Sequence, residues 1–228
     1  MSLRIAGLVR LLQLASPSLP IGGYSYSQGL EWAIEAKMVG DAATAERWIG
    51  DAMQHAIACA DAAVAARALA AVRAPDESAF AHWNAWFRAS RETRELRAET
   101  EQMGSSLLSL ARDLGWIDAG AHAWAARAAP VTLPAAFALA ARDIDCDVET
   151  ALAAYVFAWL ENQVLVTVKA LPLGQVAGQR MLARLAARIG DVAHSAATLA
   201  DDDVASFAPG LAIASTFHET QYSRLFRS

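Results

Sequence analysis

The chain has 228 residues, of which 55% are hydrophobic and 19% are charged, and its net charge is −5. Intrinsic disorder is excluded, because it requires low hydrophobicity and a high net charge, and the pI of about 5.5 argues against a nucleic-acid partner. Cys59 and Cys146 lie far apart without a CxxC motif, so the sequence indicates neither a disulfide framework nor a zinc site. The length suits a single domain over residues 1–228 with a substantial core.

Two apolar stretches raise the question of a membrane, since the mean hydropathy is +0.25. Residues 11–30 are interrupted by prolines and glycines, and residues 150–168 contain Glu161. A charged residue at the centre of a membrane span costs about 2.5–3.5 kcal/mol, so residues 150–168 are predicted to form a core helix. Arg10 interrupts the apolar region that a signal peptide would need. We therefore expect a cytoplasmic protein without membrane contact.

The predicted elements are helical, because no segment alternates with a period of two and no Asn-Gly or Asp-Gly hairpin signal is present. The expected fold class is all-α, a single bundle-like domain of roughly ten helices. A loop at 16–23 separates the first two helices, and Asp41 is placed to cap the third. In chain order, we expect helices at residues 3–15, 25–38, 42–73 with possible breaks, 77–89, 91–114, 119–128, 134–142, 148–170, 175–189 and 191–200, before a final segment that ends in a tail.

Apolar spacing predicts which helix faces are buried. The predicted inward stripes are Leu8, Leu11, Leu12 and Ala15 in the first helix, Leu96, Met103, Leu107, Leu110 and Leu114 in helix 91–114, and Met181, Leu182, Leu185 and Ile189 in helix 175–189. Arg91 and Glu95, four residues apart, are expected to pair on a helix surface. The helix at 148–170 is apolar around most of its circumference and should be central. A stripe of arginines is expected to be solvated, or else to meet an acidic partner: Arg180, Arg184 and Arg188.

No motif of reaction chemistry is present, since the chain lacks a Gly-x-Ser-x-Gly elbow, a Walker loop, a dinucleotide fingerprint and an HExxH pair. The arrangement most similar to a metal site is Asp51, His55 and Cys59, at positions i, i+4 and i+8 of a helix. Three ligands spread along one helix are too far apart to converge on one ion. A buried cysteine and a half-buried histidine are therefore favoured, with His55 and Cys59 kept as weak metal candidates. No firmly bound cofactor is expected.

Other polar and aromatic clusters also have structural interpretations. The acidic run at 201–203 is predicted to be a solvated cap, because adjacent helical residues point in different directions. His218 and Glu219 are neighbours that do not face each other, so an acid–base pair is not expected. The aromatic group at 83–87 is predicted to belong to the core or to an interface: Trp83, Trp86 and Phe87.

Four sequence motifs carry a family resemblance. They are LLQLASPSLPIGGYSYSQGLE at Leu11–Glu31, RETRELRAETEQMG at Arg91–Gly104, PLGQVAGQR at Pro172–Arg180 and HETQYSRLFRS at His218–Ser228. In this order and spacing, the chain resembles the UreF family of urease accessory proteins over nearly its whole length.

The resemblance implies an all-α homodimer that takes part in nickel insertion into urease and is not itself an enzyme. Members of the family are expected to bridge UreD (UreH in some species) and the nickel-carrying GTPase UreG. The assembly docks on apo-urease and couples GTP hydrolysis to nickel delivery, so nickel is handled by the complex. This chain has no histidine-rich tail, and nothing indicates nickel storage.

For docking on UreD, the resemblance points to a tail at about residues 218–228. Its apolar and basic side chains are of the kinds found at interface hot spots: Tyr222, Arg224, Leu225, Phe226 and Arg227. A chain end is disordered unless it is tied down, so ordering on binding is expected. Deletion of residues 218–228 is expected to abolish UreD binding while the domain stays folded.

For UreG binding or gating, the resemblance points to the first motif and to the segment around the third. The residues are Tyr24, Ser25, Tyr26 and Glu31, together with Lys169, Gly174 and Gln175. A purely structural interpretation is also open, in which the first motif is a fixed turn and Gln175 caps a helix.

Two other functions remain open from the residues alone. One is an all-α interaction scaffold or regulator unrelated to urease, which association with UreG would exclude. The other is an all-α metal-dependent enzyme that uses His55, Cys59 and the carboxylates at 201–203, which a metal assay on the purified protein would test.

Overall fold

The computed structural model describes residues 4–228 and confirms the all-α fold class, with no strand in that range. The elements are α1 (Ile5–Leu14), η1 (Gly23–Ser25), α2 (Leu30–Glu35), α3 (Ala42–Ala52), η2 (Met53–Asp61), α4 (Ala62–Arg73), α5 (Glu77–Ser90), α6 (Arg94–Asp113), α7 (Ala119–Arg127), α8 (Leu133–Ala141), α9 (Val148–Ala170), α10 (Gln175–Ala186), α11 (Ile189–Thr198), η3 (Asp201–Asp203) and α12 (Pro209–His218). Most bounds lie within a few residues of the expected ones.

Side-chain caps explain where many of these helices begin. Asp41 and Thr44 form a capping box at the start of α3, as predicted for Asp41. Each of the other capping side chains accepts a hydrogen bond from the backbone N–H three residues further on, which satisfies one of the free donors of the first turn. They are Asp76 for α5, Thr93 for α6, Asp118 for α7 and Asp147 for α9.

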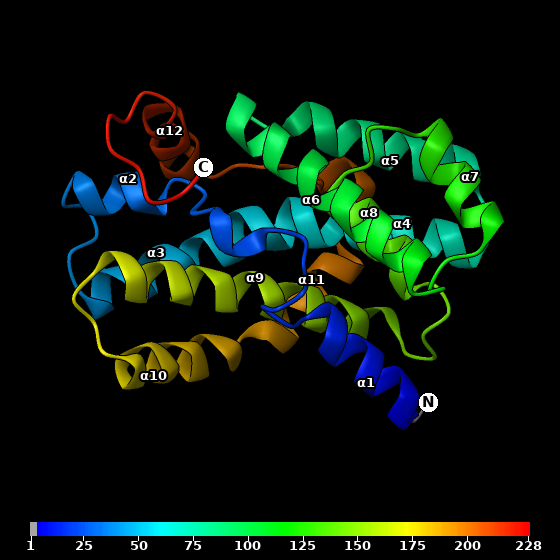
Figure 1. Cartoon of the computed structure of the whole chain (residues 1–228), viewed down its shortest axis with the longest axis horizontal. Helices are drawn as coiled ribbons and strands as arrows, with labels where there is room; N and C mark the ends of the chain where they lie inside the picture. The colour runs from blue at the N-terminus through cyan, green and yellow to red at the C-terminus, as the bar shows by residue number, and fades with distance from the viewer. Residues whose placement is uncertain (1–3) are drawn as a thin grey trace.

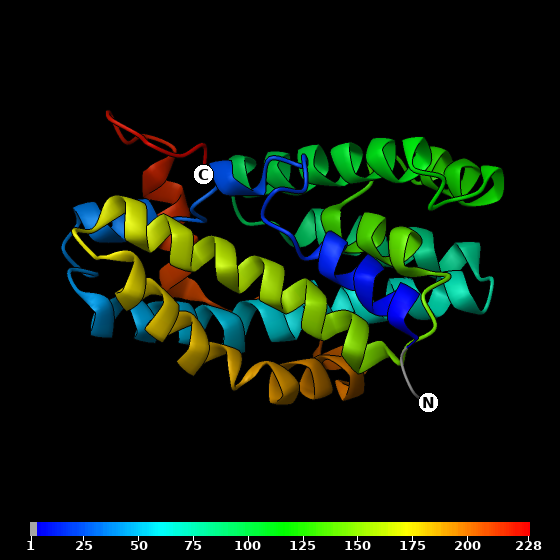
Figure 2. The same ribbon diagram turned by 60° about the horizontal axis from the view of Figure 1, so that its bottom comes forward.

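The helices pack into an elongated body (Figure 1). In one half, α4 packs against α5 and α8, and α6 covers α8. In the other half, α9 packs against α10 and α11 and also reaches α4, as expected for a central apolar helix. Figure 2 shows α12 and the tail at one end of the molecule, above α2, while α1 lies toward the opposite end.

Small residues allow α8 to approach both α4 and α6 closely. Both α4 and α8 are rich in alanine, and nearly all of their alanines are buried. Gly104 of α6 lies against the backbone before α8, where an added Cβ would be 2.7 Å from the carbonyl carbon of Thr132. The high alanine content thus provides close helix packing rather than many large core side chains.

The predicted helix 42–73 is one continuous helical run whose middle, η2, is a π-helix. A π-helix has a wider turn than an α-helix and is uncommon at this length. The run and α9 are both long and apolar enough to span a membrane, but 78% and 50% of their most apolar windows are buried in the fold. Core packing therefore accounts for much of their apolar character.

The predicted helix at 25–38 is wrong in its first half, since α2 begins only at Leu30. Gln28 and Gly29 have φ angles of 53° and 80°, which belong to the left-handed region and interrupt a right-handed helix. Gly29 is required here, because an added Cβ would lie 2.8 Å from the backbone nitrogen of Ser215 in α12. The interruption thus results from a contact with a segment almost 190 residues away.

Two predicted surface patterns also differ from the structure. In α1, Leu11 and Ala15 are buried as expected, but Leu8 and Leu12 are exposed. The expected pair of Arg91 and Glu95 does not form, because Arg91 precedes α6 and its guanidinium instead contacts the Asp61 carboxylate at 3.4 Å. The other stripes are largely confirmed, except that Leu110 is half-buried and Leu114 is exposed.

Candidate functional site

The segment after α12 folds back onto the body of the protein, where buried polar side chains receive it. We call this group the tail clamp and define it as Glu31 of α2, Glu95 and Glu99 of α6, and His218 at the end of α12. The residues that it holds, 224–228, form the inner tail. The clamp therefore joins three of the four sequence motifs in one place.

Glu31 binds the backbone of the inner tail. Its Oε1 accepts a hydrogen bond from the Leu225 N–H at 2.6 Å, and its Oε2 accepts one from the Phe226 N–H at 3.1 Å. The same Oε2 lies 3.1 Å from Nε2 of His218, whose side chain is fully buried. Glu31 is itself buried, so in this conformation it serves the tail and is not accessible to a partner protein.

Glu95 holds the other side of the clamp. Its Oε2 lies 2.8 Å from Nδ1 of His218, and its Oε1 accepts a hydrogen bond from the Arg224 guanidinium at 2.5 Å. The backbone N–H of Glu95 donates to the Glu219 carboxylate, so the start of α6 and the end of α12 are tied together. His218 does not face its neighbour Glu219, as expected, but it faces two glutamates that are distant in the chain.

Glu99 binds the last part of the inner tail. Its carboxylate accepts hydrogen bonds from the Ser228 hydroxyl at 2.7 Å and from the Gln28 amide at 2.8 Å. Burial raises the pKa of Glu99 to about 7, although these two hydrogen bonds act in the opposite direction. Two backbone hydrogen bonds, each of 2.7 Å, connect the inner tail to the first motif: Arg227 N–H to the Ser25 carbonyl, and Ser27 N–H to the Ser228 carbonyl.

The five tail residues predicted to bind UreD divide into two groups. Phe226 is buried, and Arg224 is held by Glu95, so these two anchor the tail. Tyr222 and Leu225 are 105% and 73% exposed, and Arg227 is also exposed. The expectation that the tail becomes ordered on binding therefore differs from the structure, in which the clamp supplies hydrogen-bond acceptors that the tail sequence does not reveal.

The residues predicted to bind UreG lie partly beside this tail. The Lys169 ammonium of α9 is 5.9 Å from the Tyr24 ring and 5.8 Å from the Phe226 ring, within range of a cation–π interaction. Tyr24 and Lys169 are both exposed, whereas Ser25 is half-buried. Gln175 is exposed at the start of α10, where the structure gives no side-chain cap, so the alternative capping role is not found.

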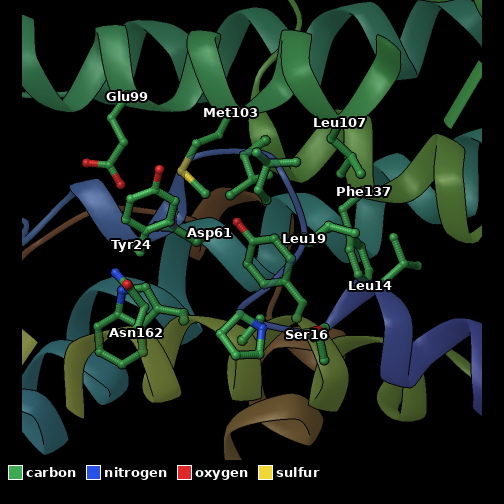
Figure 3. A pocket seen from close by; sticks show the side chains of 18 of the residues that line it. Leu14, Ser16, Leu19, Tyr24, Asp61, Glu99, Met103, Leu107, Phe137 and Asn162 are labelled. Atoms are coloured by element: carbon green, nitrogen blue, oxygen red, sulfur yellow. The ribbon is translucent and has the colours of Figure 1, made fainter. Parts of the chain in front are cut away.

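A cavity of about 100 Å³ lies beneath the first motif. In Figure 3, Glu99, Met103 and Leu107 approach it from α6, with Asn162 of α9 on the opposite side. Most of the lining is apolar, and the polar side chains that join it include Ser16, Glu99 and Asn162. The volume has room for several water molecules.

A second buried carboxyl group, Asp61 at the end of η2, also lines the cavity. Burial raises its pKa, while the nearby Arg91 guanidinium lowers it. Burial likewise raises the pKa of Tyr155, which lines the same cavity. Two of the Arg91 nitrogens, Nε and Nη2, are buried without a hydrogen-bond partner, although the guanidinium lies over the Phe87 ring.

The weak metal candidates are not brought together with further ligands. The expected burial of the two side chains is wrong by one step each, since His55 is exposed and Cys59 is half-buried. Asp51 is exposed, and the Cys59 thiol is directed at the Gln54 carbonyl oxygen within η2, 3.4 Å away. In residues 4–228, no three His, Cys, Asp or Glu side chains lie in an arrangement that could hold a metal ion. Asp201 in the predicted acidic cap pairs with Arg67.

The sequence pattern did not indicate the clamp side chains of α6 or the role of His218. Glu95 and Glu99 lie among arginines and therefore resemble a solvated helix face. One signal was present, since Glu99 follows Leu96 by three residues and precedes Met103 by four, which places it on the apolar stripe. A carboxylate on such a stripe requires a buried partner, but the sequence does not identify it.

Comparison with known proteins agrees with the motifs. A family model for UreF matches residues 39–186. Urease accessory protein UreF of Azoarcus sp. (strain BH72) is 52% identical over 224 residues, which cover 97% of this chain and 95% of that protein. Urease accessory protein UreF of Bordetella parapertussis is 50% identical over 220 residues, which cover 95% of this chain and 100% of that protein.

A further relative is a fusion. The bifunctional urease accessory protein UreEF of Bordetella bronchiseptica is 50% identical over 230 residues, which cover 100% of this chain and 53% of that protein. The match to this fused protein covers the first motif, the clamp and the tail, whereas the family model covers residues 39–186. The chain belongs to the UreF family of urease accessory proteins.

Proposed function

We propose that this protein is a non-enzymatic adaptor in the maturation of urease, which bridges UreD (UreH) and the GTPase UreG on apo-urease during GTP-dependent nickel insertion. Family membership supports the urease role over an unrelated scaffold. The fused relative carries UreE in its name, which supports work alongside other accessory proteins. Nickel is cargo of the assembly and not a resident cofactor, and the proposed location is the cytoplasm.

The observation that carries the proposal is the outward face of the tail. Tyr222 and Leu225 are large apolar side chains that the fold leaves exposed, while Glu31 of the clamp holds the backbone of Leu225 and Phe226. Exposed apolar groups on an ordered support are suited to protein docking, since little conformational entropy is lost on binding. We assign this face, with Arg227 beside it, to UreD.

The UreD contact is tested with the double substitution Tyr222→Ala and Leu225→Ala. We expect UreD affinity to fall about 30-fold or more, because truncating hot-spot residues costs about 2 kcal/mol or more. Phe207→Ala is the matched control, since Phe207 is 77% exposed and lies outside the tail. Equal affinities of the double variant and the control would refute this assignment.

The UreG contact is assigned to the exposed pair of Tyr24 and Lys169, together with Ser25 and Gln175. Glu31 contributes indirectly, because it is buried under the tail. Lys169→Ala and Tyr24→Ala are expected to weaken UreG capture without lowering Tm, with Arg112→Ala as an exposed basic control outside the motifs. If these variants lose stability in proportion to any loss of UreG binding, the residues have a structural role instead.

The whole function is tested by reconstitution with apo-urease, UreD, UreG, GTP, bicarbonate and nickel. Urease activity should depend on this protein and should fall with the tail variant but not with Phe207→Ala. Homodimer formation, also proposed, is measured by sedimentation of the purified chain. Nickel content of the protein alone, determined after gel filtration, should stay below one ion per chain.

A further inference from the structure

His218 lies at the centre of the tail clamp with both ring nitrogens against carboxylates. Nδ1 is 2.8 Å from Glu95 and Nε2 is 3.1 Å from Glu31, and the side chain is 0% exposed. Carboxylate oxygens that are ionised only accept hydrogen bonds, whereas a neutral imidazole has one donor and one acceptor nitrogen. A neutral ring would therefore direct a lone pair at one of the two carboxylates.

The other contacts of both glutamates favour their ionised forms. Glu31 accepts two backbone N–H groups of the inner tail, and Glu95 accepts the Arg224 guanidinium. Hydrogen bonds donated to a carboxylate stabilise its charged form. With both glutamates ionised, the geometry is satisfied when His218 carries both ring protons. The charges of the buried Glu31 and His218, the half-buried Glu95 and the exposed Arg224 then balance within one group.

We propose that His218, as an imidazolium, is the positioning residue that holds the inner tail closed and so presents Tyr222 and Leu225 for docking. The inference rests on the proposed function for its docking part. Without the charge of His218, the buried Glu31 and the half-buried Glu95 would share one counter-charge, that of Arg224. Because an uncompensated buried charge is strongly unfavourable, the tail would then be released.

The titratable and charged groups around His218 come from each packed element. They are Glu31 from α2, Glu95 from α6, Arg224 from the tail, and Glu219, which binds the Glu95 backbone at the end of α12. Glu99 lies further along α6 and binds Ser228. Arg224 is positive throughout the accessible pH range. The charge of His218 therefore decides whether the negative charges of Glu31 and Glu95 are both compensated.

The first test is NMR of the full chain labelled with ¹⁵N. In the folded protein with the tail closed, both ring nitrogens of His218 should show imidazolium shifts, each with a directly bonded proton that exchanges slowly. His194 provides the comparison, since it meets a single carboxylate, Glu149, on the surface. Detection of a single protonated ring nitrogen in His218 would overturn the inference.

The second test measures hydrogen-exchange protection of the Leu225 and Phe226 amides, corrected for the intrinsic effect of pH. In His218→Gln, this protection should fall about tenfold or more, while exchange in α4 and α9 stays slow. His194→Gln should change neither the protection of the two tail amides nor the exchange in α4 and α9. If His218→Gln does not fold, the wild type is titrated instead. Protection of the two amides should then be lost together with the second ring proton, and persistence with a neutral ring would contradict the proposal.

Binding to UreD separates this inference from the proposed function. Release of the tail and weaker UreD binding in His218→Gln, with neither effect in Phe207→Ala, would support both the role of His218 and the proposed function. Release of the tail with unchanged UreD affinity would overturn the positioning role and leave the adaptor function in place. A tail that responds as described in a protein that never binds UreD would overturn the proposed function, but not the effect of His218 on the tail.

Discussion

Glu99 connects the inner tail to the cavity under the first motif, and its carboxyl group makes folding sensitive to pH. Its pKa rises from 4.5 in the unfolded chain to about 7 in the fold, mainly because of burial. The folded state therefore binds the proton more tightly. The contribution of Glu99 to stability is complete below pH 4.5 and is lost as the pH rises to about 7.

Glu99→Gln should remove this dependence. The amide can still donate to the Ser228 hydroxyl and accept from Gln28, without a charge to bury. Above pH 7 the variant is expected to be more stable than the wild type by up to about 3 kcal/mol, and the difference should shrink toward pH 4.5. Urea unfolding at several pH values measures it, with Glu101→Gln on the same helix as control. If the free energy of unfolding changed with pH in the same way for the wild type and the variant, the prediction would be contradicted.

At the scale of the elements, the helices follow local signals that the sequence contains. Asp41, Thr93 and Asp147 begin helices where a capping residue precedes an apolar pattern. The late start of α2 follows no local signal of comparable strength. It depends on Gly29 passing close to Ser215, a contact that is defined when α12 has packed.

The candidate site was also predictable only in part, because some of its contacts join segments that are distant in the chain. The motifs drew attention to the tail and the first loop, which the structure brings together, and Tyr222 and Leu225 are exposed. The clamp was not predictable, because the partners of Glu31 and Glu95 lie more than 120 residues away. Periodicity reports which face of a helix is apolar, but it does not report which distant backbone will cover a carboxylate on that face.

Gly104→Ala tests the close packing of α6 on the segment before α8. A Cβ at this position would meet the Thr132 carbonyl carbon at 2.7 Å and the Val131 carbonyl oxygen closer still. Because backbone atoms must shift, we expect a loss of about 1–3 kcal/mol in the free energy of unfolding. Gly190→Ala is the control, since it has open space in α11 and should be neutral or stabilising by up to about 1 kcal/mol. Similar effects of the two substitutions would exclude close packing as the cause.

At the scale of the whole molecule, the tail contributes to the fold as well as to the proposed docking. Deleting residues 222–228 exposes the site of Phe226 and removes donors from Glu31 and Glu99. We expect a loss of roughly 3 kcal/mol and a fall in Tm of roughly 6–12 °C. A deletion from residue 218 should cost more, because His218 is fully buried.

The double substitution Tyr222→Ala and Leu225→Ala serves as the comparison for this deletion. Both side chains are exposed, so Tm should stay within about 1 °C of the wild-type value. Differential scanning calorimetry measures all three proteins. If the deletion variant had the same Tm as the wild type, the inner tail would not be held by the clamp in solution.

The alanine contact between α4 and α8 has a consequence for how this family can vary. Where two helix backbones are separated by methyl groups, little volume remains to be removed, and even one added methylene has no space to occupy. Tolerance to substitution at these positions should therefore depend on side-chain size more than on polarity, with Gly or Ser accepted more readily than Val or Leu. A larger side chain on one helix would require a smaller one on the facing helix, so substitutions at this contact should be accepted mainly as pairs.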